Sequence, residues 1–325
     1  MVSEIINLKL GDIKTPLPQK IISKFCKKVF LDVNQYPHNY PKLISILSKK
    51  LGVNEDEIIL TNGVDEGIEL IARCFGQSTL VFTPSYYEFI DAPKRNQLTY
   101  KAINCFDGKS FKLKYTDEDL AGKSLVYLCN PNNPFGLLTK NEILDFAQKT
   151  KAIVAVDETY NAFDGETVIK TLPNVLVLRS FSKAYSIAGL RIGFIVGKKE
   201  LIDEIRIKEL YASVTSVSVA AAIIVLEEEK YFKKLIENLK KRKDAFEEFM
   251  IKKSFKVMHT NTNNIIVQFL SKADADEFFI YLKSNGVIVN QGNGVSTCGL
   301  DDAWIRFACG TSEQMKKVKK IIEKW

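Results

Sequence analysis

The sequence contains only two histidines, His38 and His259, among its 325 residues. This scarcity argues against a metal site built from several histidines, and against most catalytic triads, which need a histidine base. No two of the six cysteines have the Cys-x-x-Cys spacing, so zinc ribbons and thioredoxin-type redox motifs lack support. We therefore expect no metal cofactor and interpret the cysteines as reduced thiols.

Long hydrophobic runs and a strong charge of one sign are also missing. No apolar stretch reaches the ~18 residues that a membrane-spanning helix needs, and the first residues lack the basic and apolar regions of a secretory signal. The 46 basic and 39 acidic residues give a formal net charge of +7, with acidic residues interleaved among the lysines of the second half. A solvated helix face explains such lysines better than a nucleic-acid surface. We expect a cytoplasmic protein that binds neither membranes nor nucleic acid.

Short apolar runs alternate with helical patterns in the first two thirds of the chain. The runs are unbroken, as in parallel strands covered on both faces, and they occupy residues 58–60, 79–83, 125–129, 153–156, 175–178 and 192–196. After about residue 200 long helical patterns dominate, with extended segments at 264–269 and 304–308. We predict an α/β protein with a large, mostly parallel-sheet domain at residues 32–205. A smaller α+β domain is predicted from both chain ends, residues 1–31 and 206–325.

A lysine with phosphate-binding neighbours follows one of these runs. Ligand sites in parallel sheets lie beyond the carboxyl ends of the strands, so the polar residues there are the candidates. Lys183 comes shortly after the run that ends at Leu178, with Ser180, Ser182 and Arg191 around it. Hydroxyls and an arginine can bind a phosphate while the lysine amine forms an imine with an aldehyde. A lone lysine at such a place is more often a surface residue, so the neighbours carry this prediction.

Four further segments are weak when taken singly. Asp157 ends an apolar run and either caps a helix or pairs with a protonated ring nitrogen. Asn133 lies in an Asn-Pro-rich turn, where its amide could also donate to a phenolic oxygen of a cofactor. Residues 61–67 begin a helix whose free N–H groups could bind a phosphate. Tyr86 could stack on a planar ring or simply pack in the core. Their order along the chain makes the signal specific.

The order is a phosphate-binding turn, an aromatic residue, Asn-Pro-Asn-Asn-Pro, Asp-x-x-Tyr, Ser-x-Ser-Lys and Gly-Leu-Arg. Over roughly residues 30–320 this order resembles fold-type I, class I/II aminotransferases, in particular the histidinol-phosphate aminotransferase group. The resemblance implies the fold type I of transferases that depend on pyridoxal 5'-phosphate, with this cofactor and a homodimer. It implies ping-pong transfer of an amino group between a small amine or amino acid, phosphorylated or not, and a 2-oxo acid. Relatives include decarboxylases of amino-acid phosphates (threonine phosphate or serine phosphate), which is the alternative reaction.

The resemblance also implies a role for each matching residue. Lys183 would be the Schiff-base lysine and proton shuttle, Asp157 the partner of the ring nitrogen, and Tyr160 with Asn133 the pair at the phenolic oxygen. Arg306 would bind the acidic group of the substrate. The other expected cofactor-binding residues surround the ring and its phosphate: Val64, Asp65, Tyr86, Ser180, Ser182, Arg191 and, toward the neighbouring subunit, Tyr36.

Two positions depart from the family pattern. The family usually has an Asn-Glu-Asn-Pro stretch near its start that helps close over the substrate, and residues 7–12 here have nothing similar. Relatives that use histidinol phosphate tend to have an arginine where this chain has Asn290. One phosphate-binding arginine is therefore missing, which leaves Arg306 alone. These changes leave the expected cofactor site intact and the substrate open.

Overall fold

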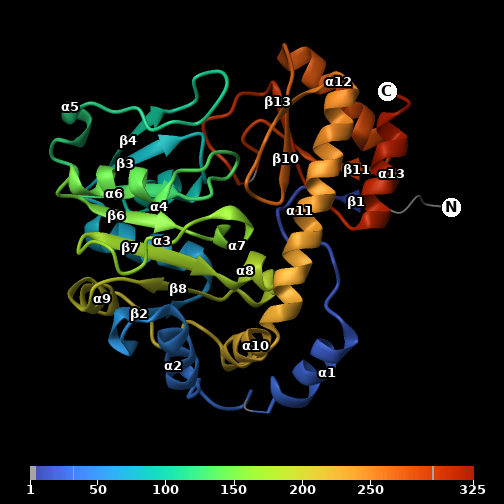
Figure 1. The fold of residues 1–325 in the computed structure, drawn as a ribbon. Coiled ribbons are helices and arrows are strands. Elements are labelled where there is room, and N and C mark those ends of the chain that lie inside the picture. The colour runs from blue at the N-terminus through green and yellow to red at the C-terminus, as the bar shows by residue number, and fades with distance from the viewer. Residues whose placement is uncertain (1–4, 32, 295) are drawn as a thin grey trace.

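The computed structural model describes residues 5–31, 33–294 and 296–325, and a seven-stranded sheet forms its centre (Figure 1). The strand order is β2-β8-β7-β6-β5-β3-β4. The pairs from β7 to β4 are parallel, whereas β8 runs antiparallel to both of its neighbours. The expectation of a mostly parallel sheet is therefore confirmed. The strands are β2 (Ile58–Thr61), β3 (Ser78–Thr83), β4 (Thr99–Asn104), β5 (Leu125–Cys129), β6 (Ile153–Asp157), β7 (Val175–Ser180) and β8 (Gly193–Val196).

The unbroken apolar runs arise because helices cover both faces of this sheet. Along β5, Val126 and Leu128 pack in one hydrophobic cluster with Phe146 of α6 (Lys140–Gln148). The alternate residue Tyr127 packs in another cluster, together with Phe89 of α4 (Glu88–Arg95). Helices α3 (Gly63–Phe75) and α9 (Lys199–Arg206) contribute to the same cluster as α4. Every position of β5 is buried as a result.

Strand β4 shows where the sequence pattern fails. It pairs with β3 alone, at the edge of the sheet, and five of its six residues are exposed. Its sequence, Thr-Tyr-Lys-Ala-Ile-Asn, has no apolar run, because an exposed edge strand does not need one. The long helical stretch after residue 200 is divided into α9, α10 (Ser216–Glu227) and α11 (Glu229–Lys252). Among the described residues, no helix combines the length and the apolar character needed to cross a membrane.

A second, four-stranded sheet is built from the C-terminal third of the chain. Its order is β12-β13-β10-β9, and all three pairings are antiparallel. Strand β1 (Ile6–Asn7) pairs with β11 (Val287–Ile288), which brings the start of the chain to this region. Helix α11 extends from the large sheet to this second sheet (Figure 1). The remaining elements here are β9 (Lys256–Met258), β10 (Asn264–Gln268), α12 (Lys272–Ser284), β12 (Asn290–Gln291), β13 (Trp304–Ala308) and α13 (Ser312–Ile322).

The predicted division into two domains stays a prediction, because one hydrophobic cluster crosses both proposed boundaries. Ile21 of α1 (Gln19–Lys28) and Val219 of α10 pack in the same cluster as Leu43 of α2 (Tyr40–Leu51) and Phe194 of β8. Segments that the sequence assigned to the small domain thus also pack against the large sheet. Short helices complete the fold: η1 (Glu55–Glu57), α5 (Asp117–Leu120), α7 (Asn161–Asp164), α8 (Phe181–Ala184) and η2 (Ala188–Leu190).

Candidate active site

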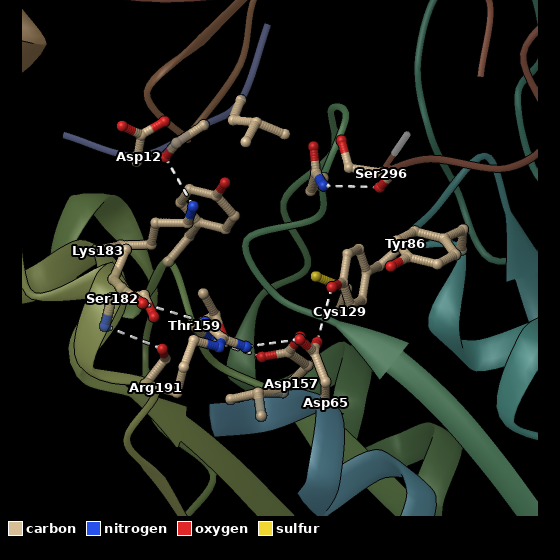
Figure 2. A pocket seen from close by; sticks show the side chains of 18 of the residues that line it. Asp12, Asp65, Tyr86, Cys129, Asp157, Thr159, Ser182, Lys183, Arg191 and Ser296 are labelled. Atoms are coloured by element: carbon tan, nitrogen blue, oxygen red, sulfur yellow. Dashed lines mark hydrogen bonds and ion pairs between the residues drawn. The ribbon is translucent and has the colours of Figure 1, made fainter. Parts of the chain in front are cut away.

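A cavity of about 580 Å³ lies between the two sheets, at the carboxyl ends of β5, β6 and β7. Eleven of the twelve residues predicted from the sequence line it, and Figure 2 shows how several of their side chains converge. The exception is Tyr36. The eleven are Val64, Asp65, Tyr86, Asn133, Asp157, Tyr160, Ser180, Ser182, Lys183, Arg191 and Arg306.

Lys183 is presented to the cavity by the one-turn helix α8, which directly follows β7. Ser180 caps this helix, because its Oγ accepts a hydrogen bond of 3.0 Å from the backbone N–H of Ser182. Nζ of Lys183 donates a 2.7 Å hydrogen bond to the carbonyl of Gly11, and no carboxylate of the described chain lies within 4.0 Å of it. Burial lowers the pKa of Lys183 to about 8. A substantial neutral fraction of this amine, the nucleophilic form, is therefore present near neutral pH.

Asp157 is the last residue of β6, so its carboxylate projects from the end of a central strand. It is 4% exposed, and its Oδ1 accepts a 2.8 Å hydrogen bond from the backbone N–H of Thr159. Within the described ranges no lysine, arginine or histidine nitrogen lies within 4.0 Å of it. Burial raises its pKa to about 6. A buried acid without a cation is costly, and a protonated ring nitrogen in the cavity would compensate it.

Several hydrogen-bond donors gather at the start of α3. No side chain caps this helix, so its first N–H groups are available to a ligand. Nη2 of Arg191 donates a 2.7 Å hydrogen bond to Oδ2 of Asp65, and the hydroxyl of Tyr86 donates to Oδ1 at 2.7 Å. Gly63, with φ of +74°, lets Arg191 approach, because a Cβ there would lie 2.7 Å from Nη2. Together with Ser180 nearby, these groups suit a phosphate.

Arg306 faces the same cavity from β13 of the second sheet. It is 2% exposed, its Nη1 donates to Oδ1 of Asn133 at 3.2 Å, and its Nη2 donates to Oγ of Ser296. Its Nε is buried without a hydrogen-bond partner, and in the part of the chain that the structure describes no carboxylate lies within 4.0 Å of the guanidinium. Burial lowers the pKa of Arg306. A cation held in this way suits an anionic group of a ligand.

Tyr36 does not reach the cavity of its own chain. Its side chain is 76% exposed, and its ring lies 5.8 Å from the ring of Tyr211, which is 84% exposed. The expectation for Tyr36 concerns the cavity of a neighbouring subunit, and it stays a prediction.

The sequence reasoning missed the segment of residues 8–12, which we call the strap. Gly11 and Asp12 line the cavity, and Asn263 also donates to the carbonyl of Gly11, at 2.9 Å. A Cβ on Gly11 would lie 3.0 Å from the hydroxyl of Tyr160, so a larger residue here would displace its neighbours by a few tenths of an ångström. Asn290 does not line the cavity and instead donates to the carbonyl of Lys9 at 2.7 Å. The departures from the family pattern at 7–12 and at Asn290 were the signal that could have located the strap.

Comparisons with known proteins place this geometry in a family. The profile of the family described as "Aminotransferase class I and II" matches residues 3–322. The chain is 30% identical over 338 residues to a histidinol-phosphate aminotransferase of Methanocaldococcus jannaschii, covering 97% of this chain and 88% of the relative. It is 33% identical over 312 residues to histidinol-phosphate aminotransferase 2 of Haemophilus influenzae, covering 90% and 82%.

Solved structures share the fold at lower identity. The histidinol-phosphate aminotransferase of Sinorhizobium meliloti, in complex with pyridoxal-5'-phosphate, superposes with a TM-score of 0.86 at 21% identity, covering 99% of this chain and 92% of that one. The L-threonine-O-3-phosphate decarboxylase of Porphyromonas gingivalis gives a TM-score of 0.84 at 22% identity, covering 98% and 99%. Both have the predicted fold, so the fold alone does not separate the two reactions.

Proposed function

The chain belongs to the class I and II aminotransferase family, whose members depend on pyridoxal 5'-phosphate, and from this premise we propose its reaction and the residues that perform it. It moves an amino group between a small amine or amino acid and a 2-oxo acid in a ping-pong cycle, as a homodimer in the cytoplasm. One observation supports the proposal above all. The charged groups of Lys183, Asp157 and Arg306 face one cavity, and within the described residues none has an oppositely charged group within 4.0 Å.

The residues of the cavity fit the cofactor. When bound, pyridoxal 5'-phosphate supplies an electron sink for the bond broken at the substrate α-carbon. Asp157 would hold its ring nitrogen, since this buried carboxylate otherwise lacks a cation. Asn133 and Tyr160 would contact the phenolic oxygen, and Tyr86 would lie against the ring. The phosphate would be held by the uncapped start of α3 together with Ser180, Ser182 and Arg191.

Lys183 is assigned to transfer the proton to and from the α-carbon of the substrate. Its Nζ accepts a proton from the substrate α-carbon as a general base and returns it as a general acid. The pKa of about 8, lowered by burial, lies close to neutral pH, where a group can perform both tasks. The carbonyl of Gly11 accepts the hydrogen bond of Nζ and so fixes the position of the amine when it is free. The strap therefore contributes directly to the position of the reacting group.

Arg306 is assigned to bind the carboxylate of the substrate. An amino acid and a 2-oxo acid carry a carboxylate at the same distance from the reacting carbon, so one arginine can serve both halves of the cycle. The buried Nε without a partner and the Nη2 near Ser296 are donors on one guanidinium, as carboxylate binding requires. The carboxylate would also supply the counter-charge that this buried cation lacks.

The dimer has its own support in exposed apolar side chains of two segments, residues 30–36 and 207–211. Phe30, Leu31, Val33, Tyr36, Ile207, Leu210 and Tyr211 are each more than half exposed, and the rings of Tyr36 and Tyr211 lie 5.8 Å apart. Exposed apolar side chains that gather in one place are typical of an interface. The test is to mix the inactive variants Tyr36→Ala and Lys183→Ala. If Tyr36 serves the neighbouring cavity, the hybrid has one site with both residues intact, and activity returns. No recovery in a proven hybrid would refute this role.

The reaction is tested with the holoenzyme and one amino donor, without an acceptor. We expect pyridoxamine phosphate and the keto product in equal amounts, because the half-reaction leaves the amino group on the cofactor. Adding 2-oxoglutarate should then restore the starting form. Release of CO₂ without pyridoxamine phosphate would instead identify the decarboxylase that was the alternative from the sequence.

A further inference from the structure

Of the charged residues that one chain contributes to the cavity lining, one cation and one anion lack a role toward the cofactor and a partner among the lining residues. The lining has three bases (Lys183, Arg191, Arg306) and three acids (Asp12, Asp65, Asp157). Arg191 and Asp65 form an ion pair with each other. Under the proposed function Lys183 and Asp157 serve the cofactor. Arg306 of β13 and Asp12 of the strap remain, and Asp12 forms an ion pair with Lys14, which does not line the cavity.

The strap holds Asp12 in a defined place beside Lys183. Leu8 is fully buried and its N–H donates to the carbonyl of Ile288, so the strap is anchored where it leaves β1. Further along, Asn290 donates to the carbonyl of Lys9, and Lys183 to that of Gly11. Figure 2 shows Asp12 on this segment next to Lys183, with Ser296 across the cavity. Asp12 is therefore placed to meet a substrate that reacts at Lys183.

The carboxylate of Asp12 retains capacity for a ligand. Its Oδ1 accepts a 2.7 Å hydrogen bond from Nζ of Lys14, while for Oδ2 the described residues provide no hydrogen-bond donor. The side chain is 41% exposed, so its pairing with a ligand is only partly screened by solvent. A positively charged group at Oδ2 would be favoured there, and a negatively charged group would be repelled.

We infer that the amino donor is an α-amino acid with a positively charged distal group, and that phosphorylated donors are excluded. This rests on the proposed function. The α-carboxylate lies on Arg306, and the distal ammonium lies against Asp12. A phosphate ester would bring nearly two negative charges to a cavity where this chain offers the substrate a single cation, Arg306. Two nitrogens of that cation already donate to Asn133 and Ser296, and the side chain of Asn290 is directed to Lys9.

The test compares donors that differ at the distal end, with 2-oxoglutarate as acceptor. L-ornithine and L-norvaline have the same chain length, with and without the terminal ammonium, and histidinol phosphate is the phosphorylated probe. We expect kcat/KM for ornithine to exceed that for norvaline about fivefold, the range of a partly exposed ion pair. Histidinol phosphate should lie at least about tenfold below ornithine, since it lacks a matching set of charged donors.

The variant Asp12→Asn separates this role from a structural one. It should raise KM for ornithine about fivefold, leave its kcat unchanged, and leave both constants for norvaline unchanged. The matched control is Asp145→Asn on the exposed side of α6, which should change neither donor. Equal cofactor absorbance and melting temperature in both variants show that folding is intact.

Three results would overturn the inference. The first is that histidinol phosphate is the best donor. The second is that Asp12→Asn lowers kcat/KM equally for ornithine and norvaline. The third is that ornithine transfers no amino group. The proposed aminotransferase function is tested separately, by whether 2-oxoglutarate reconverts enzyme loaded with pyridoxamine phosphate. If reconversion occurs together with any of the three results, the proposed function holds and only the inferred substrate class is refuted. If reconversion does not occur, the proposed function itself is refuted.

Discussion

The two sides of the cavity are built in different ways. On the cofactor side, Asp157, Ser180 and Lys183 come from one short stretch, residues 157–183, and each follows or ends a central strand. On the substrate side, Asp12 and Arg306 come from opposite ends of the chain. Parallel strands bring their carboxyl ends to one edge, so the first group meets wherever the sheet forms. The second group meets only after the strap has docked on the second sheet. The difference separates what local pattern specifies from what long-range packing specifies.

The largest expected effect is on the cofactor side, from Lys183→Ala. Turnover should fall at least about 1000-fold, because the general base and the nucleophile are both removed. Borohydride reduction, which links a lysine-bound aldehyde covalently to the chain, should label Lys183 in the parent enzyme and leave the variant unlabelled. Peptide mass mapping reads the label. Lys198→Ala, at an exposed lysine that precedes α9, should behave like the parent enzyme. A labelled Lys183→Ala protein would contradict the assignment.

Asp157→Asn should reduce kcat about 100-fold, as expected when a preorganised charge is removed from a buried site. The amide keeps the oxygen that accepts the hydrogen bond of Thr159, so the variant isolates the charge. Single-turnover rates with one amino donor provide the measurement. A loss below about threefold would show that the ring nitrogen is held by another group.

The same variant should make the cofactor-free chain more stable at neutral pH. The pKa of Asp157 is raised from the ordinary 3.8 to about 6, so the native state binds more protons than the unfolded state between these values. Its ionised form therefore opposes folding above pH 6 and has no such effect below pH 3.8. At pH 7.5 Asp157→Asn should raise the free energy of unfolding by about 3 kcal/mol, and at pH 3.5 by nearly nothing. Urea unfolding at both pH values measures this, and a less stable variant at pH 7.5 would oppose it.

On the substrate side, Arg306→Gln should raise KM for the amino donor and for the 2-oxo acid about 30-fold each, from the loss of charge-assisted hydrogen bonds. The affinity for pyridoxal 5'-phosphate should fall much less, because Arg306 meets the cofactor side only through its 3.2 Å hydrogen bond to Oδ1 of Asn133. Steady-state kinetics with both substrates, beside cofactor titration, gives the two readouts. Arg95→Gln, at an arginine that pairs with Glu69 and Glu88 and does not line the cavity, is the matched control. If Arg306→Gln lowered the affinity for the cofactor as much as that for the substrates, the cofactor side and the substrate side would not be distinct.

The smallest effect among these four variants is expected at Gly11, which lies in the strap and near residues of both sides of the cavity. A Cβ on Gly11 would lie 3.0 Å from the hydroxyl of Tyr160 and 3.5 Å from Nζ of Lys183. Gly11→Ala should therefore displace the strap, lower kcat/KM about tenfold and cost about 1 kcal/mol of stability. For stability the control is Gly189→Ala, where the added Cβ meets no atom within 4 Å. Melting curves and steady-state kinetics test this prediction. An unchanged kcat/KM would show that the strap accommodates the added methyl group without displacing the reacting groups.

Much of the fold could be predicted because burial on both faces leaves unbroken apolar runs. The run at 125–129 coincides with β5, and that at 304–308 with β13. Strand β4 was missed because its residues are mostly solvent-exposed. The helical stretch after residue 200 hid the break between α9 and α10, where Ile207, Leu210 and Tyr211 are exposed apolar residues that imitate a helix pattern.

The sequence by itself indicated six of the seven strands of the large sheet, the family and the residues proposed for the cofactor side, because strand ends and the motifs that follow them are local in the chain. Only the tertiary structure decided where residues 8–12 and Asn290 lie. The hydrogen bonds of Asn290 to Lys9 and of Lys183 to Gly11 end on backbone carbonyls, which leave no mark in the sequence. The position of Asp12 beside Lys183 follows from those carbonyl contacts, and the departures from the family pattern at residues 7–12 and at Asn290 mark the segment without placing it.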